Sequence, residues 1–348
     1  MTDLSPLRLS VLDTVPVWQG SSAAESLRNA LDLAQQAERL GYVRFWVAEH
    51  HNTPSLATSS PAVLVGQVAA ATTSIRVGSG AVLLPNHAPL TIAEQFGVLT
   101  SLHPDRIDLG IGRAAGTDPY TAGLLRGARA AGTEHFGQQL AELASYFAPP
   151  GEAETDVFAV PQVSPGPPIW LLGSSTSSAA AAARLGLPYA YAHVINPAEC
   201  TAALRTYRAE FRPSPRLAAP YAIVAAGVIV ADTSDEAERL GRSFAHGQLL
   251  SRLQRGSTLP RPDQTEATRF STAHLEFMRE RQATQVVGDP AGVRERLVAI
   301  VADSGADEVM ALTMVWDHTA RVRSYELLAS LTETAPVATR AAGAEDLG

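Results

Sequence analysis

The chain has 348 residues, of which 46% are hydrophobic and 18% charged, and its formal net charge is −8. This length suits one large α/β barrel or two ordinary domains. The acidic balance, without any basic block, argues against nucleic acid and anionic membranes as partners. The chain contains no lysine, which excludes a Schiff-base lysine and a P-loop lysine.

Cysteine usage and the N-terminal residues predict a cytoplasmic protein. Cys200 is the single cysteine, so no intramolecular disulfide can form. The first residues, from Met1 to Pro6, lack both the charged and the apolar region of a signal peptide. No apolar run is long enough to span a membrane.

Short apolar segments are predicted as strands, and the amphipathic segments between them as helices. The expected strands cover residues 7–12, 45–48, 76–84, 107–111, 169–172, 189–192, 221–230 and 308–312. Capping residues mark helix starts at Ser60-Pro61, Asn196-Pro197 and Asp289-Pro290, and Gly305 supplies a left-handed stop. Eight strands that alternate with helices favour a closed (β/α)8 TIM barrel as a single domain over residues 1–348, with a doubly wound open sheet as the alternative.

Four stretches are less regular. Residues 113–133 are rich in Gly, Ala and Arg and are expected to form a surface excursion over one rim of the barrel. Val157–Val160 is expected to be a small extra strand inside a loop rich in Pro and Gly. Residues 247–284 have little periodicity and are expected to form a mobile lid, and residues 335–348 a frayed tail.

The second strand runs directly into Glu49, His50 and His51. In a parallel α/β protein the carboxyl ends of the strands form the rim at which chemistry is done, so at least one of the two histidines is expected in the active site. No metal site is expected, because adjacent residues on a strand point to opposite faces and the chain has neither a His-Glu-x-x-His motif nor a cysteine cluster.

The third and fourth strands carry glycines that point to the same rim. Gly78 and Gly80 weaken a core strand unless a bulge or the close approach of a flat ring requires them. Gly110-Ile111-Gly112 matches a dinucleotide-binding fingerprint only superficially, because Arg113 stands where the backbone should meet pyrophosphate. The better use of Arg113 is as a cation for a phosphate.

Gly173 and the hydroxyl side chains after the fifth strand form a candidate anion site at the start of a helix. The hydroxyl residues are Ser174, Ser175, Thr176, Ser177 and Ser178. Backbone N–H groups, hydroxyls and the helix dipole would all point to one place. A plain serine-rich helix cap is the alternative, and the pattern is not that of a serine hydrolase.

Together these stretches resemble the bacterial luciferase-like family of flavin-dependent monooxygenases over about residues 7–331. The matching motifs are Ala48-Glu49-His50-His51, residues 77–85, residues 104–113, the turn at 173–178, Val287-Gly288-Asp289-Pro290 and Asp307-Glu308-Val309-Met310. The resemblance implies a barrel that binds FMN at its C-terminal rim. It gives His50 an acid/base role, Gly80-Ala81 a non-proline cis peptide against the flavin ring, and Arg113 with Ser174–Ser178 the phosphate contacts.

The resemblance also implies partners and leaves alternatives open. Reduced FMN would come from a separate reductase, O₂ would oxygenate a small organic substrate, and the protein would be a homodimer joined through the helices after strands two and three. Gly112 replaces a cysteine of the luciferases, so light emission is not expected. An F420-dependent oxidoreductase, for which Arg126 and Arg129 are candidate cations, and a flavin-binding protein without turnover are the alternatives.

Overall fold

The computed structural model describes residues 7–126, 135–149, 157–253 and 258–332. Eight parallel strands close into a barrel, because the eighth of them pairs with both the seventh and the first. The barrel strands are β1 (Arg8–Asp13), β2 (Arg44–Val47), β3 (Arg76–Ser79), β5 (Ile107–Gly112), β6 (Ile169–Gly173), β7 (Tyr189–Ala192), β8 (Ala222–Val230) and β10 (Glu308–Leu312). The predicted TIM barrel is therefore confirmed, and the open sheet is excluded.

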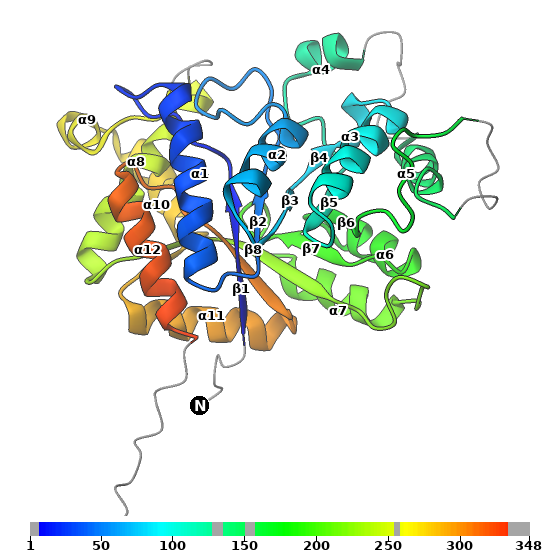
Figure 1. The fold of residues 1–348 in the computed structure, drawn as a ribbon. Helices are drawn as coiled ribbons and strands as arrows, with labels where there is room; N and C mark the ends of the chain where they lie inside the picture. The colour runs from blue at the N-terminus through cyan, green and yellow to red at the C-terminus, as the bar shows by residue number, and fades with distance from the viewer. Residues whose placement is uncertain (1–6, 127–134, 150–156, 254–257, 333–348) are drawn as a thin grey trace, which may run out of the picture.

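Helices surround the barrel on the outside (Figure 1). They are α1 (Ala23–Arg39), α2 (Pro61–Ala71), α3 (Pro89–Leu102), α4 (Pro119–Arg126), α5 (Phe136–Ser145), α6 (Thr176–Arg184), α7 (Cys200–Glu210), α8 (Ser234–Leu253), α9 (Pro262–Ala267), α10 (Thr272–Ala283), α11 (Pro290–Ser304) and α12 (His318–Ser330). Fully buried apolar faces of these helices and of the strands make one large core. No helix among the described residues is long and apolar enough to cross a membrane.

The third barrel position is divided, where one continuous strand was predicted over 76–84. β3 ends at Ser79, the peptide bond from Gly80 to Ala81 is cis, and β4 (Val82–Leu83) continues beside β5. Close packing explains both glycines: a Cβ on Gly78 would lie 2.5 Å from the Asp108 carbonyl oxygen, and one on Gly80 would lie 3.2 Å from the Trp46 ring. The cis bond is the one that the resemblance implies.

Helix starts were predicted with mixed success. The side chain of Asp289 accepts the N–H of Gly292 at the start of α11, and Gly305 ends that helix with a positive φ of 67°, both as predicted. Asn196, in contrast, does not cap α7, which begins four residues later. Its side-chain amide instead donates to the Ser174 carbonyl oxygen (3.2 Å), so Asn196 stabilises the loop at the barrel rim and does not cap the helix.

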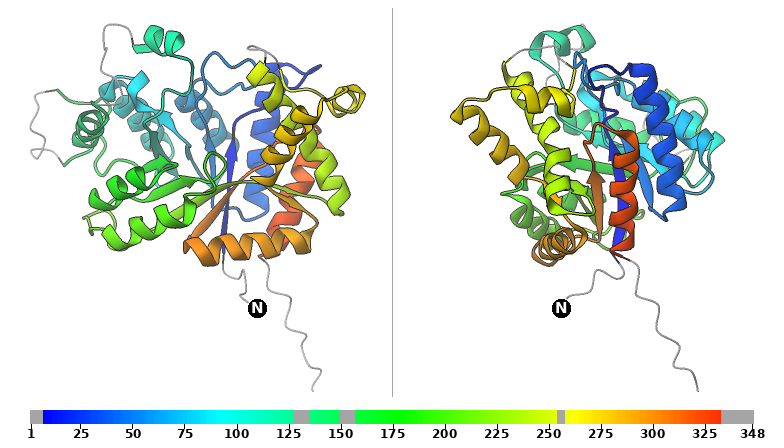
Figure 2. Two further views of the ribbon diagram at one scale, coloured as in Figure 1. Left: turned by 180° about the vertical axis from the view of Figure 1, so that it is seen from behind. Right: turned by 90° about the vertical axis from the view of Figure 1, so that its left-hand side faces the viewer.

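Two local features differ from the prediction. Val157–Val160 forms no strand, and three of its four side chains are at least half exposed. The short strand β9 (Val286–Gly288), which pairs with the end of β8, was missed. Residues 247–284, expected as a mobile lid, are largely helical where described, and α10 packs beside α8 (Figure 2). Their role as a lid stays a prediction. The sequence concealed α10 because Met278 is its only buried residue, so it has no apolar stripe.

An ion network closes the N-terminal mouth of the barrel. The guanidinium of Arg44 donates to the Asp108 carboxylate at 2.8 Å and to both oxygens of Glu308 at 2.8 and 3.0 Å. Asp108 also accepts from Trp46 Nε1 (3.1 Å) and from Arg76. Arg44, Asp108 and Glu308 are buried, so their charges depend on one another for stabilisation.

Replacement of Arg44 by alanine should strongly destabilise the fold. It leaves the buried Glu308 carboxylate without its cation and Asp108 with Arg76 alone, which costs about 3–5 kcal/mol. Urea unfolding measures the change. Arg323→Ala is the matched control, because its pairs with Asp232 and Glu326 are exposed to solvent, which screens them and leaves them little effect on stability. Equal losses in the two variants would contradict the role given to Arg44.

Candidate active site

A cavity of about 470 Å³ opens at the C-terminal rim, where the ends of β2, β4, β5, β6 and β7 meet. Most of the predicted site residues line it together. They are His50, Gly80, Ala81, Arg113, Gly173, Ser174 and Ser175. Thr176 and Ser177 do not line it, whereas Ser178 does. The structure therefore brings residues from five separate strand ends to one space that is large enough for a cofactor-sized ligand.

A buried carboxylate fixes the floor of this cavity. One oxygen of Glu49 contacts His51 Nε2 (2.7 Å) and His87 Nε2 (2.8 Å), and the other accepts the N–H of Leu83 (2.9 Å). Burial by itself would raise the pKa of Glu49, but the bonds from His87, Leu83 and His51 outweigh it and hold the pKa below its ordinary value. Because an ionised carboxylate only accepts hydrogen bonds, both imidazoles must carry their proton on Nε2.

The same three side chains could also hold a metal ion, since their ligand atoms lie within 4.8 Å of one another. The hydrogen bonds already satisfy Glu49, Nε2 of His51 and Nε2 of His87 without an ion. His50 and His51 do point to different environments, as expected for neighbours at a strand end. His50 faces the cavity and His51 turns to Glu49.

His50 has the protonation behaviour of a proton-transfer group. Its Nδ1 is buried and has no hydrogen-bond partner among the described residues. Burial lowers the pKa of His50 below 6.5, the nearby Glu49 charge opposes that shift, and His51 adds to it. The imidazole is therefore neutral at pH 7 and can take up a proton from a bound molecule or exchange one with it.

Arg113 supplies an unpaired cation at the cavity. Its side chain is exposed at the end of β5, and it makes no hydrogen bond or ion pair with any residue that the structure describes. Most other arginines that line cavities form an ion pair with a carboxylate of the protein. An exposed guanidinium without a partner is suited to bind an anionic group of a ligand.

The start of α6 also lines the cavity, but its hydroxyl and N–H groups are only partly available to a ligand. Ser175 is the N-cap and accepts the N–H of Ser178, whose hydroxyl also bonds the Tyr189 hydroxyl at 2.8 Å. The Thr176 N–H and hydroxyl both lie near a Glu199 oxygen, at 3.4 and 3.5 Å. The anion site therefore rests on Ser174, Ser175 and Ser178, while Thr176 faces a carboxylate.

Several residues of the site were missed from the sequence. Glu49 was noted without a role, and His87 and Asn196 were not considered as site residues. The signal available was the position of a carboxyl group at the buried end of a strand, where it must find donors. His87 could be found only through the fold, because 38 residues separate it from Glu49.

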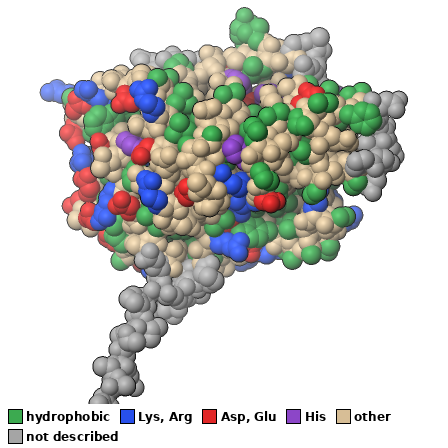
Figure 3. Space-filling model, in the orientation of Figure 1, with side chains coloured by type: hydrophobic (Ala, Val, Ile, Leu, Met, Phe, Trp, Pro, Cys, Tyr) green, Lys and Arg blue, Asp and Glu red, His purple; other side chains and the backbone are tan. Residues whose placement is uncertain are grey.

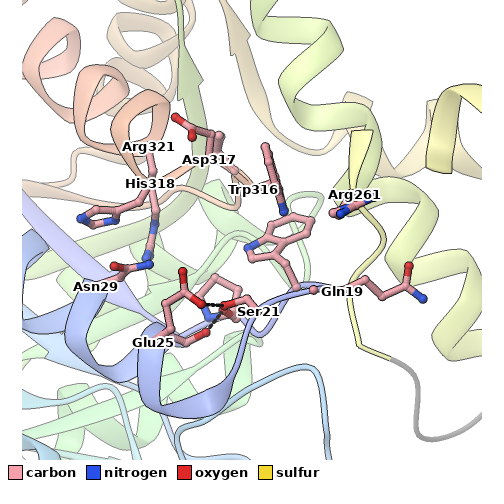
Figure 4. Close-up of a pocket in the computed structure, with 14 residues that line it drawn as sticks. Gln19, Ser21, Glu25, Asn29, Arg261, Trp316, Asp317, His318 and Arg321 are labelled. Atoms are coloured by element: carbon pink, nitrogen blue, oxygen red, sulfur yellow. Dashed lines mark hydrogen bonds between the residues drawn. The ribbon is translucent and has the colours of Figure 1, made fainter. Parts of the chain in front are cut away.

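A second cavity, of about 320 Å³, lies between the starts of α1 and α12 (Figure 4). Arg321, Arg261 and His318 line it, and each of them has a carboxylate partner within 2.8 Å. Its basic groups are therefore already matched by acids of the protein. The rim cavity, with the free Arg113 and the free His50 Nδ1, is the better candidate for the active site.

The family model described as luciferase-like monooxygenase matches residues 7–308. A luciferase-like monooxygenase of Escherichia coli is 43% identical and aligns over 96% of this chain and 99% of its own. The N-acetyl-S-alkylcysteine monooxygenase of Bacillus subtilis is 33% identical, over 92% of this chain and 97% of its own. Among solved structures, apo-MsnO8 is 38% identical, covers 93% of this chain and 98% of its own, and has a TM-score of 0.85.

Two more distant structures share the fold and differ in cofactor. The oxygenating constituent of 3,6-diketocamphane monooxygenase from Pseudomonas putida was solved with FMN (20% identity, TM-score 0.67, 94% of this chain and 98% of its own). An F420-dependent secondary alcohol dehydrogenase was solved with an F420-acetone adduct (11% identity, TM-score 0.68, 94% and 99%). At these identities the likeness concerns the barrel alone.

His50 should titrate below pH 6.5. Because burial disfavours the imidazolium, the neutral form persists as the pH falls to 6.5 and the proton is taken up only below it. Nitrogen-15 NMR of histidine-labelled protein measures this, with His50→Gln to assign the resonance. A His50 pKa at or above 6.5 would contradict the burial argument.

Proposed function

The chain belongs to the luciferase-like monooxygenase family, and on that premise we propose that it is a flavin-dependent monooxygenase. It uses reduced FMN and O₂ to oxygenate a small organic substrate. The observation that carries the proposal is a single cavity that presents neutral His50, unpaired Arg113 and the start of α6 to the same space.

The residues of the rim cavity fit FMN. Arg113 and the Ser174–Ser178 turn would hold the phosphate, because a free guanidinium and a helix start both favour an anion. The Gly80-Ala81 peptide would lie against the flavin ring. When bound, reduced FMN would supply the electrons with which O₂ is activated.

The protein's own part in the chemistry is to hold and move a proton. His50 is neutral and half-buried, so its imidazole can accept a proton from the substrate side and later return it. Glu49 is tied to β4 through the Leu83 N–H, so the end of β2 that carries His50 is fixed to the strand beyond the cis peptide.

F420 is the alternative cofactor, and the charges near the cavity favour FMN. A deazaflavin with a long acidic tail needs further cations beyond the phosphate contact. Arg126 does not line the cavity, and Arg129 lies outside the described residues. A flavin-binding protein without turnover is the third possibility. His50, which faces the cavity and whose Nδ1 has no partner among the described residues, argues against it, because binding needs no proton shuttle.

We also propose the partners and the substrate class. The described residues form one barrel without a second nucleotide-binding domain, and a separate reductase would deliver reduced FMN, as the family resemblance implies. Val63 of α2 and Val98 and Leu102 of α3 are exposed, and Figure 3 shows apolar side chains over this part of the surface. These two helices would form the homodimer contact. Because a 33% identical relative is named for N-acetyl-S-alkylcysteines, thioethers are the first substrates to try.

Replacement of Arg113 by alanine should weaken FMN binding about tenfold or more, because one charge-assisted contact to the phosphate is lost. Riboflavin lacks the phosphate, so its affinity should not change. Fluorescence titration of both flavins into both proteins measures the difference. An equal loss for FMN and riboflavin would show that Arg113 does not contact the phosphate.

Replacement of His50 by alanine should leave FMN bound and remove oxygenated product. Oxygen uptake driven by NADH, a flavin reductase and FMN, with a panel of N-acetyl-S-alkylcysteines, measures the coupling between O₂ consumed and product formed. F420 with its own reductant replaces FMN in a parallel series. His103→Ala, at the end of α3 and outside the cavity, is the control.

If His50→Ala forms as much product per O₂ consumed as the wild type does with FMN, His50 has no acid/base role. Substrate-dependent turnover with F420 and none with FMN would overturn the choice of cofactor. Tight flavin binding without any turnover across the panel would favour the non-catalytic alternative.

A further inference from the structure

The barrel has a second pocket at its opposite, N-terminal mouth. It measures about 390 Å³ and lies where β1, β2 and β3 begin, with α5 and the turns before β6, β7 and β8 as its other walls. None of its lining residues borders the rim cavity. We call it the N-terminal pocket.

The N-terminal pocket has an excess of positive charge. Arg8, Arg44, Arg76 and Arg216 line it, and Asp108 is its single acidic residue. Arg44 and Arg76 are matched by Asp108 and Glu308. Among the residues that the structure describes, Arg8 and Arg216 form no ion pair, which leaves two unmatched cations.

Most hydrogen-bond donors of these two arginines remain available. Arg216 donates to a protein acceptor at the Phe147 carbonyl oxygen, 3.1 Å away through Nη2. A guanidinium carries five N–H donors, so four remain. Arg8 lies at the Tyr221 hydroxyl, which itself donates to Glu308 at 2.7 Å.

The other walls of the N-terminal pocket are apolar. Leu187 and Pro188 come from the turn before β7, Leu217 from the loop before β8, and the aromatic rings are those of Trp170 and Tyr221. The Trp170 ring is buried and packs edge-on against Tyr221, with centroids 5.7 Å apart. Its Nε1 has no hydrogen-bond partner among the described residues. Unmatched cations, apolar walls and an orphaned donor are the features of a site for an organic anion.

We propose that the N-terminal pocket binds a small organic carboxylate, with its anionic head on Arg8 and Arg216 and its apolar body against Trp170, Leu187 and Leu217. A planar carboxylate matches the fork of donors on a guanidinium. The apolar walls select a carboxylate with a hydrophobic body over inorganic phosphate, which has none. This site is separate from the proposed flavin site, and neither depends on the other.

One buried side chain connects the N-terminal pocket to the rim cavity. Trp46 donates to Asp108, which lines the pocket, and its ring lies beneath Gly80, which lines the cavity.

Calorimetric titration with 2-naphthoate tests the proposal on the full-length protein, with and without FMN. We expect 2-naphthoate to bind at one site, and the neutral 2-naphthamide and inorganic phosphate each to bind at least about tenfold more weakly. Arg216→Ala and Arg8→Ala should each weaken 2-naphthoate by about tenfold or more. Arg205→Ala, an exposed residue of α7 outside the pocket, should not.

Four results would overturn the proposal. The first two are no binding of 2-naphthoate and the same affinity in Arg216→Ala, Arg8→Ala and Arg205→Ala. The third is competition between 2-naphthoate and FMN, which would place the ligand at the rim. The fourth is phosphate that binds as tightly as 2-naphthoate, which would show that the apolar walls play no part. Failure of FMN to bind, with 2-naphthoate still bound, would count against the flavin proposal alone.

Discussion

The Glu49 carboxylate is buried and ionised, so it must accept hydrogen bonds from several directions, and the rim is arranged around that need. The Leu83 N–H comes from beyond the cis peptide, His87 from the turn after it, and His51 from the end of β2 itself. These bonds hold the backbone on which His50 lies, so His50 faces the cavity although its ring makes no hydrogen bond with the described residues. One acidic group thus fixes the neighbour that we propose for proton transfer.

Much of this could be predicted from the sequence because strand ends in a parallel barrel share a rim. Given the order of strands, His50, Gly80, Arg113 and Ser174 had to meet, whatever the details of packing. The glycines of the third strand were recognised as exceptional, but their cause was only half predicted. Gly78 is needed because the Asp108 backbone approaches it, and that approach depends on a pairing between strands that no local pattern reveals.

The failures have the same origin. For both Asn196 and α10, long-range contacts outweighed the local pattern. Asn196 looked like a helix cap but hydrogen-bonds the Ser174 carbonyl oxygen. Helix α10 has one buried side chain and no apolar stripe, and it packs against α8. Val157–Val160 looked like a strand because its residues are apolar, yet no edge of the closed barrel is open to receive it. Residues 254–257 of the predicted lid and the whole predicted tail, 335–348, lie outside the described residues.

Trp46 limits which substitutions the chain can accept in evolution. Its indole is fully enclosed, with one end bonded to Asp108 and the other against Gly80, so neither neighbour can be enlarged or shortened alone. A bulkier residue at 80 would push the ring and break the bond to Asp108. A smaller ring would leave a void and remove one of the two donors to that carboxylate oxygen, the other being Arg44. Substitutions of Trp46, Gly80 and Asp108 should therefore be epistatic. Combinations of them should be tolerated where each single substitution destabilises the protein.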